Sequence, residues 1–439
     1  MRQSLFAAYV ASLMASLQNL IEKVNGKRNG VLTYLHKDTS ILKKVYSADG
    51  KWESTSVNTT YVAADFVSMD SPLPIKSRDA IAVANGKLPK LGISKTLKES
   101  DIDALNAMEA QQGDAGVRAR RIRKKLADDP VACDAGLDEL LEYSFLFGLS
   151  HGYVAMPDED NPKNLLRLNY GYFDSHRFGA SKKGEISLSD IKRVIDYADS
   201  EDDNTITTIW ISKTAFDALR QTREARELVA YYLGSTFDED TVLPVPTSSK
   251  FMEAFEDDTN VKFKVINRSV QFEKNGSKKS VKPWLTTALV FTCNEQVGSL
   301  VYGQLAESTN RVDGVMYQLI DDFKLISKYS LTNPLREMSG GQAKAAPIIE
   351  DVDQIYVYDY DESTSQEEDT DAETVDTEDK YITIWGSKYT KSEVIAQYKE
   401  VSGVSRVAAN ISDASLIEKI NELSDEQEST LKAALTPAS

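Results

Sequence analysis

The sequence predicts an α+β protein in which a long core helix and several short sheets are preceded by an extended arm and followed by a small helical C-terminal module. Three observations lead to this prediction. Apolar residues repeat with a helical period over residues 131–149, β-branched runs alternate with helical patterns between residues 165 and 295, and an acidic stretch sets off residues 380–439. Because 439 residues exceed the roughly 250–300 that one hydrophobic core supports, two or three domains are expected.

The composition is typical of a soluble, packed protein. Hydrophobic residues make up 41% and charged residues 27% of the chain, and no stretch approaches the roughly 18 apolar residues of a membrane span. Two cysteines, Cys133 and Cys293, are too few for a disulfide framework and indicate a reducing compartment. Both lie among apolar neighbours, so we expect buried, inert thiols.

Residues 1–29 are predicted to form an N-terminal arm helix. Apolar residues spaced alternately by four and three positions form a heptad seam, which consists of Phe6, Val10, Leu13, Leu17, Leu20 and Val24. The seam ends at Asn25-Gly26 and runs through any plausible cleavage site, which argues against a signal peptide.

Residues 30–116 are predicted to form an extended arm and loop. Strand-like pieces are separated by polar residues and by prolines, notably Pro72, Pro74 and Pro89. A segment of this length with so little core-forming pattern is uncommon in a compact domain and usually serves a partner.

The region 117–200 is expected to contain the main core helix. The helical patterns at 98–109 and 117–126 should be over by Asp128-Asp129-Pro130, and a new helix should run from Val131 to Leu149 with an apolar stripe on one face.

Residues 201–295 are predicted to form a second α+β region, and residues 296–349 to return to the first. A strand at 205–212 and a helix at 214–233 precede further strands. Ser339-Gly340-Gly341-Gln342 is interpreted as a hinge, because no Ser or Thr follows that could complete a nucleotide-binding loop.

The formal charge of −17 is concentrated in residues 350–379. That stretch holds fourteen Asp or Glu and no Lys or Arg, which leaves a net charge of only −3 for the rest. We interpret it as a flexible linker to a small helical module at 380–439. In that module a strand at 381–385 should precede two helices, opened by capping boxes at 390–393 and 424–427.

No pattern predicts a catalytic, cofactor-binding or metal-binding site. The three histidines, His36, His151 and His176, lie far apart and without metal-ligand spacing. The acidic runs lack the central glycine and terminal glutamate of a calcium loop, and no Gly-x-Ser-x-Gly elbow occurs. We therefore expect a protein that is not an enzyme and uses no cofactor.

Outside residues 350–439, the densest cluster of like charges is a basic run. It consists of Arg118, Arg120, Arg121, Arg123, Lys124 and Lys125, and its acidic neighbours are Glu109, Asp114, Asp128 and Asp129. No aromatic residue lies within the run, so an ion-pairing helix face is favoured over a nucleic-acid contact. If the face has a function, we expect its basic side chains to pair with acidic side chains of a neighbouring subunit.

Four stretches carry a resemblance to a known family. They are the proline-bearing residues 71–75 and 88–91, the helix-forming residues 118–152, the pair 188–191 and 209–216, and residues 297–323. In that order they resemble the E-loop, the spine helix, the A-domain and the returning P-domain strands of capsid proteins with the Hong Kong 97 fold, in particular the lambda-like major capsid branch. The resemblance covers roughly residues 1–345. It implies that residues 117–200 hold the spine helix and first part of the P-domain, 201–295 the A-domain and 296–349 the P-domain return.

The resemblance implies a major capsid protein of a tailed bacteriophage. Such a chain self-assembles through pentamers and hexamers into an icosahedral head around double-stranded DNA, which it encloses without sequence-specific binding. The implied partners are portal, scaffold and auxiliary or decoration proteins; the implied location is the virion, after assembly in the host cytoplasm. The lambda-like branch has no covalent crosslink, and none is assigned to Lys87 or Lys90.

An arm and a seam-forming helix bury little in a single chain, so the resemblance implies that both lie across neighbouring subunits. The candidate intersubunit contacts are Phe6, Val10, Leu13, Leu17, Pro72, Pro74, Pro89, Arg118, Arg121 and Lys125. Three other interpretations stay open: an encapsulin-like compartment around cargo enzymes, a hydrolase that uses carboxylate pairs, and a phage tail or adhesion protein.

Overall fold

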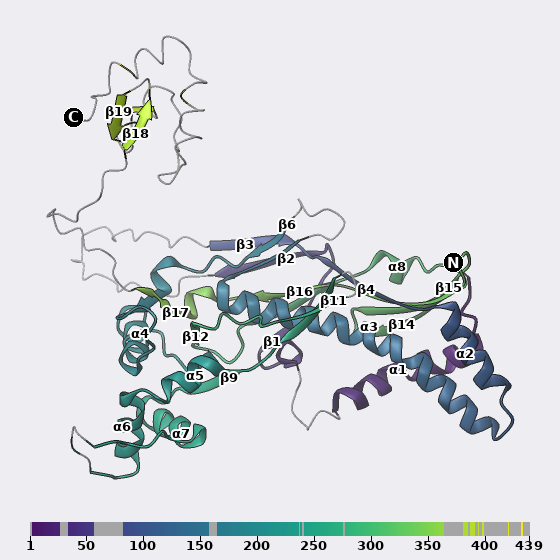
Figure 1. Cartoon of the computed structure of the whole chain (residues 1–439), viewed down its shortest axis with the longest axis horizontal. Coiled ribbons are helices and arrows are strands. Elements are labelled where there is room, and N and C mark those ends of the chain that lie inside the picture. Colours follow the sequence, from purple (N-terminus) through teal and green to yellow (C-terminus); the bar gives the residue numbers. More distant parts are fainter. Residues whose placement is uncertain are drawn as a thin grey trace, which may run out of the picture. The chain divides into compact units, whose positions relative to one another are not determined.

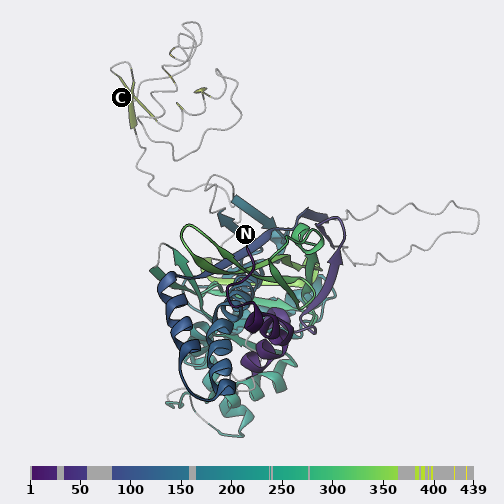
Figure 2. The ribbon, with the colours of Figure 1, turned by 90° about the vertical axis from the view of Figure 1, so that its right-hand side faces the viewer.

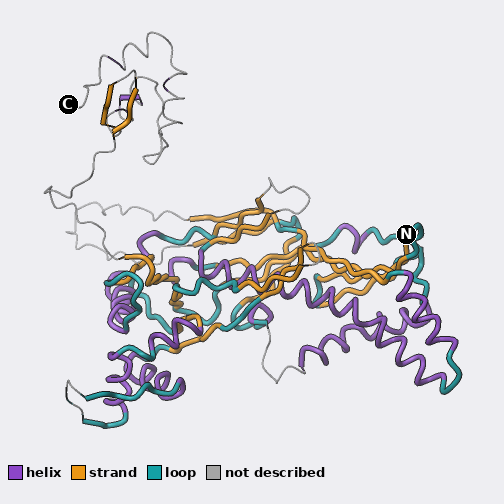
Figure 3. Tube along the Cα trace, in the orientation of Figure 1, coloured by secondary structure: helices purple, strands orange, loops and turns teal. Residues whose placement is uncertain are grey.

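The computed structural model contains two compact units, Met1–Gln366 and Glu367–Ser439, and each is described by itself. In the first unit the structure describes residues 2–26, 34–56, 82–157, 165–236, 238, 241–274 and 277–363. In the second it describes residues 381–384, 387–390, 394, 397, 398, 420 and 432. Helices and strands are both abundant in the first unit (Figure 3), which confirms the α+β class.

A 37-residue helix, α3 (Ala115–His151), runs along the first unit and contributes to two of its hydrophobic cores (Figure 1). It starts where the Asp114 carboxylate accepts a hydrogen bond from the backbone N–H of Val117 at 2.9 Å. It ends at Gly152, whose φ of +78° suits glycine. Leu137, Leu141 and Phe145 recur every four residues and are buried, so one stripe of the helix faces the interior.

Pro130 lies inside α3, so the helix end expected at residues 128–130 is wrong. Proline has no N–H, and the carbonyl four residues before it therefore loses its helical donor. That carbonyl belongs to Leu126, and Nζ of the buried Lys328 donates a hydrogen bond to it at 3.4 Å. A lysine 202 residues further along the chain thus supplies the donor that proline lacks.

The first sheet is built around the long strand β16. Its strand order is β1 (Leu42–Ser47), β13 (Gly298–Gly303), β16 (Arg336–Ile349), β15 (Lys324–Leu331) and β14 (Met316–Ile320), and β4 (Lys90–Leu97) also pairs with β16. Residues 339–342, expected to be a hinge, lie in β16 with a paired strand on each side, so the hinge interpretation is wrong. The glycines allow close packing instead, because a Cβ at Gly341 would lie 3.0 Å from Cβ of Cys133 on α3.

The second sheet carries a layer of helices. Its strand order is β7 (Arg177–Ala180), β17 (Ile355–Ser363), β12 (Ala288–Thr292), β8 (Thr208–Ser212) and β9 (Lys262–Ile266). The helices are α4 (Leu188–Glu201), α5 (Lys213–Leu219), α6 (Arg223–Tyr232) and α7 (Ser248–Thr259). β8 and β9 are parallel, and α5, α6 and α7 connect them. Ile209, Ile211, Leu289 and Phe291 are fully buried in the core of this region.

Two expectations for this region are wrong. The helix expected at 214–233 is divided, because Thr222 caps a new helix and its side chain accepts a hydrogen bond from the N–H of Ala225 at 3.3 Å. The acidic linker expected at 350–379 is wrong for its first part, because β17 takes Ile355–Tyr358 into the buried interior, and residues 364–379 lie outside the described residues. The apolar residues between the acidic ones favour the strand β17 over an unstructured linker.

The N-terminal helix α1 (Ala7–Gly26) packs with α2 (Glu99–Ala110) and the first half of α3 in a third core, and Figure 2 shows α1 beside the α2–α3 pair. The predicted helix is therefore present. Phe6, Val10, Leu13 and Leu17, however, are at most 5% exposed. They pack inside this chain, with Ile122 of α3 in the same core, so the expectation that they contact a neighbouring subunit is wrong for this fold.

Among the described residues of the first unit, three two-stranded ribbons lie outside the two sheets. They are β2 (Lys51–Ser56) with β3 (Ala82–Lys87), β5 (Tyr153–Pro157) with β6 (Leu165–Asn169), and β10 (Val270–Lys274) with β11 (Ser277–Val281). Pro89 is half-buried between β3 and β4. Pro72 and Pro74 lie outside the described residues.

The second unit contains a hairpin of β18 (Tyr381–Ile384) and β19 (Ser387–Thr390). β18 confirms the strand expected at the start of this unit. Val394, Tyr398 and Ile420 are helical and buried. The capping boxes expected at 390–393 and 424–427 lie outside the described residues, apart from Thr390 at the end of β19.

Candidate functional site

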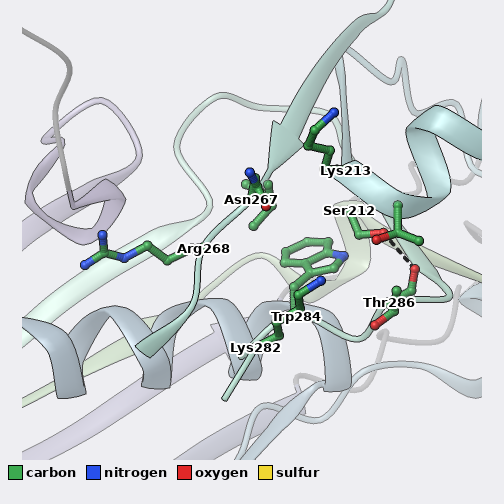
Figure 4. Close-up of a pocket in the computed structure, with 9 residues that line it drawn as sticks. Ser212, Lys213, Asn267, Arg268, Lys282, Trp284 and Thr286 are labelled. Carbon is green, nitrogen blue, oxygen red and sulfur yellow. Dashed lines mark hydrogen bonds between the residues drawn. The ribbon is translucent and has the colours of Figure 1, made fainter. Parts of the chain in front are cut away.

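A small pocket lies where β8 leads into α5 (Figure 4). Its lining consists of Ser212, Lys213, Thr214, Ile266, Asn267, Arg268, Lys282, Trp284 and Thr286. Ser212 Oγ donates a hydrogen bond to the carbonyl of Thr286 at 2.8 Å, and Trp284 Nε1 donates to the carbonyl of Ala288 at 3.0 Å. The pocket holds about 20 Å³, the room of roughly one water molecule. These polar groups serve the fold, and a substrate does not fit between them.

A network of charged side chains is buried against the middle of α3. This α3 ion network consists of His36, Lys37, Asp134, Asp138, Glu142, Asp321 and Lys324. Nζ of Lys324 lies 2.6 Å from Asp134, 3.0 Å from Asp138 and 2.7 Å from Asp321. Lys324 is fully buried, so these contacts tie the start of β15 to α3.

The same network fixes the chain before β1 to α3. Residues Leu35–Lys37 form one 3-10 turn, and Glu142 accepts hydrogen bonds from the backbone N–H of Leu35 at 3.0 Å and of His36 at 3.1 Å. The Nδ1 atom of His36 lies 2.8 Å from the same carboxylate, and Nζ of Lys37 lies 2.6 Å from Asp138. The segment expected to be an extended arm is therefore anchored at this turn.

Three of the seven residues of this network had a signal in the sequence. Asp134, Asp138 and Glu142 are spaced by four residues, which places three carboxylates on one face of the core helix, and buried charges need partners. Their partners Lys324 and His36 come from distant parts of the chain. His36 was considered only as a lone histidine, and neither Lys324 nor the three carboxylates formed part of any prediction.

Opposite charges favour the ionised forms of Lys324 and Asp138, whereas burial raises the pKa of Asp134. Burial disfavours the ammonium form of Lys324, but the three neighbouring carboxylates raise its pKa above the ordinary value. Burial would also raise the pKa of Asp138, yet the hydrogen bond from His36 and the charges of Lys324 and Lys37 lower it. We therefore treat both groups as charged in the folded protein.

The stability of the fold is expected to decrease as pH rises through the titration of His36. Burial opposes the charged ring, but the hydrogen bonds and charges of Asp138 and Glu142 raise the pKa of His36 above 6.5. A pKa raised in the folded chain stabilises the fold fully below about pH 6.5 and no longer does so above the folded pKa. As pH rises above about 6.5, urea unfolding should therefore show the parent losing stability relative to His36→Gln.

The ring of Tyr34 lies beside His36, with centroids 5.5 Å apart, and its hydroxyl does not change charge in that pH range. Burial and the Glu139 carboxylate raise the pKa of Tyr34 well above its ordinary value, so Tyr34 stays neutral. A difference between parent and variant that stays constant with pH would show that His36 is not charged in the network.

Large apolar side chains are exposed along the stretch of chain from the end of α6 toward α7. This α6–α7 tip consists of Tyr231, Tyr232, Leu233, Val242 and Val245. Val242 is 90% exposed, Tyr231 70% and Leu233 57%. Single exposed apolar residues are normal, but a group of them in one short stretch is typical of an interaction surface. The sequence analysis did not single out this stretch.

The basic run lies on the first turns of α3, where Arg121 and Lys125 are exposed and Arg118 is half-buried. No ion pair of the run occurs among the residues that the structure describes, since Asp114 caps α3 and Glu109 accepts a hydrogen bond from the hydroxyl of Tyr9 at 3.2 Å. The expected ion-pairing face is therefore wrong within this chain. A charge match with another subunit stays a prediction.

The two cysteines are free, as expected. Burial raises the pKa of the Cys133 thiol to about 11 and that of Cys293 to about 12, which keeps both protonated and unreactive. In the described part of the chain, no group of three or more His, Cys, Asp or Glu side chains is placed to hold a metal ion. No helix among the described residues has the length and apolar character of a membrane span.

No protein-family model matches the sequence, and no curated protein is significantly similar to it. Solved structures are similar to it. A protein assigned as the capsid protein of a prophage of Escherichia coli CFT073 is 11% identical, with 82% of this chain and 99% of that chain covered and a TM-score of 0.47. The mature capsid of bacteriophage PhiM1 is 9% identical, with 75% and 88% covered and a TM-score of 0.40. The SrpI encapsulin of Synechococcus elongatus PCC 7942 is 9% identical, with 74% and 86% covered and a TM-score of 0.32. Because these TM-scores lie below 0.5, the function has to follow from the residues of this chain.

Proposed function

We propose that this chain is a shell-forming subunit, the major capsid protein of a tailed bacteriophage, which self-assembles into an icosahedral head around double-stranded DNA. The α6–α7 tip carries the proposal. It presents large apolar side chains to solvent where α6 and α7 form one end of the first unit (Figure 1). Contact with another chain removes such side chains from water, which favours association.

Two further features support an assembly role. The β2–β3 ribbon pairs with no third strand among the described residues, and a two-stranded ribbon has little stability of its own. Trp52 is buried and belongs to the same core as α3, so one part of the ribbon is fixed while the rest can lie on a neighbour. The long helix α3 contributes to the core that holds Trp52 and to the core that α1 and α2 share with it.

In the proposed shell, the tips of five or six subunits meet around the centre of a pentamer or hexamer. Such a contact joins two different patches of the same chain, and rotation closes it into a ring. The β2–β3 ribbon and Pro89 reach an adjacent subunit, and Pro72, Pro74, Arg118, Arg121 and Lys125 remain candidate contacts. Portal, scaffold and decoration proteins complete the virion, which assembles in the host cytoplasm. The chain itself performs no catalysis.

A triple substitution at the tip tests this function. Tyr231→Ser, Leu233→Ser and Val242→Ser remove apolar surface that the folded chain exposes, so the melting temperature should stay within about 2 °C of the parent value. Assembly should require at least a roughly tenfold higher protein concentration, because each buried apolar side chain contributes about 1.5–3 kcal/mol. Static light scattering and negative-stain electron microscopy measure this change in the full chain.

The matched control keeps the tip apolar. Tyr231→Phe, Leu233→Met and Val242→Ile change the same positions and should assemble as the parent does. Equal assembly of the serine variant and this control would refute the tip as a subunit contact. The content of particles from the native source separates the proposal from the encapsulin-like alternative: nuclease-protected DNA supports the capsid, and a cargo enzyme in its place supports the compartment.

A further inference from the structure

A strongly basic surface lies on α3 beside α1. This α1–α3 basic face consists of Arg120, Arg121, Arg123, Lys124 and Lys125, all of which are exposed. A groove of about 840 Å³ runs between the two helices. Arg120, Arg123 and Lys124 line it from α3, and Ser12, Ser16 and Asn19 line it from α1. Most of the remaining lining is apolar and consists of Leu13, Leu20, Ala127, Val131, Ala132 and Ala135.

Two of the carboxylates next to the basic face form hydrogen bonds elsewhere. Asp114 caps α3, and Glu109 accepts a hydrogen bond from Tyr9. Asp129 is half-buried, and burial raises its pKa although the charges of Lys328, Lys95 and Lys125 act in the opposite direction. Asp128 is the one carboxylate that lines the groove, and no ion pair with the basic face occurs among the described residues. Five cations next to one another are thus left largely uncompensated within this part of the chain.

The groups on this face are mostly hydrogen-bond donors. Arginine and lysine carry donors and no acceptor, and the Ser and Asn side chains of α1 can donate as well. Arg120 and Lys124 are four residues apart, as are Arg121 and Lys125, so the cations form rows along the helix. Rows of donors fit an extended polyanion better than a single small anion, and these side chains are the usual contacts of nucleic-acid phosphates.

We propose that the α1–α3 basic face binds the phosphate backbone of nucleic acid without reading its sequence. The basic run contains no aromatic side chain that could stack on bases, which favours backbone contacts. The charges and donors of the face itself indicate that its ligand carries phosphate groups. The further identification of this ligand as the DNA inside the shell rests on the proposed function. The nucleic-acid contact, disfavoured by the sequence, thus replaces the ion-pairing face.

Binding of a fluorescent 30-base-pair duplex to the full-length chain tests the proposal, with sodium chloride varied from 50 to 200 mM. The test variant carries Arg120→Gln, Arg121→Gln, Lys124→Gln and Lys125→Gln. The matched control carries Lys182→Gln, Lys183→Gln, Lys278→Gln and Lys279→Gln, which remove four exposed charges elsewhere. Both variants have the same net charge, so only the location of the lost charges differs.

The test variant should bind at least about a hundredfold more weakly than the parent, and its slope of log K against log salt should be shallower by about 3–4 units. The control should bind within about twofold of the parent, and a duplex of scrambled sequence should bind equally well. Equal losses in both variants, or no binding by the parent at 50 mM salt, would overturn the proposal. Neither result tests shell formation, because microscopy measures particle formation separately. A test variant that binds DNA like the parent but forms no shells would identify this face as a subunit contact instead.

Discussion

Replacing Lys324 by Met should lower the free energy of unfolding by about 3–5 kcal/mol, because removing one partner of a buried ion pair leaves the other charges uncompensated. Nζ of Lys324 lies within 3.0 Å of Asp134, Asp138 and Asp321, and the lysine is fully buried. Methionine has a similar shape and no charge, so the loss measures the ion network more than packing. Urea unfolding followed by tryptophan fluorescence gives the value.

The matched control is Lys328→Met. Lys328 is also fully buried on β15, but in the described part of the chain it forms no ion pair and donates to the Leu126 carbonyl and to Ser339 Oγ. Its loss should cost about 1–3 kcal/mol, the range for leaving buried acceptors unsatisfied. A Lys324→Met cost no larger than this would mean that the network contributes little to stability.

Trp210→Ala is expected to cost about 3–5 kcal/mol, the range for emptying the site of a buried tryptophan. Trp210 is 1% exposed, and its ring meets the ring of Phe145 on α3 edge-on with centroids 6.2 Å apart. Its Nε1 donates to Thr292 Oγ1 at 3.3 Å, and Nζ of Lys264 lies 4.3 Å from the ring centroid. One side chain therefore couples β8 of the second sheet to α3, and thermal unfolding should show the loss directly.

Trp210→Phe separates the contributions of the ring and the N–H group. Phenylalanine keeps an aromatic ring beside Phe145 but cannot donate to Thr292, so a smaller loss of about 1–2 kcal/mol is expected. Similar losses for the two substitutions would show that the contact with α3 is not what stabilises this site.

Elements with their own periodicity were predictable from the sequence. The β-branched run at 205–212 contains the strand β8 (Thr208–Ser212), and the apolar seam in residues 1–29 contains the helix α1 (Ala7–Gly26). The same seam led to a wrong partner. Its side chains are covered by α2 and α3 of the same chain, because Met14 and Ile21 widen the stripe into an ordinary core-facing helix surface.

Features that depend on distant residues were not predictable. The helix α3 continues through Pro130, where Lys328 donates a hydrogen bond to the Leu126 carbonyl, and no local sequence pattern predicts that contact. The strand β17 was missed because charge was counted over 350–379, while the apolar residues Ile355–Tyr358 pair with β12 and β7. The three carboxylates that α3 contributes to the α3 ion network are spaced by four residues, which the sequence shows. The cations that pair with them could not be identified from the sequence.

The assembly role followed from the order of the segments, whereas the surfaces that would perform it came from the structure. The α6–α7 tip is defined by exposure, which a sequence of apolar residues does not reveal. The basic face could be found in the sequence, but its availability depends on where Asp114 and Glu109 bind. Local chemistry was therefore predictable, and the partners of each group were not.

Electron microscopy of the purified full-length chain tests the central claim most directly. The proposed function predicts closed icosahedral shells in which the α6–α7 tips surround the centres of pentamers and hexamers. A chain that stays a 48.7 kDa monomer at high concentration even with scaffold protein present, or that forms tubes or fibres, would contradict it.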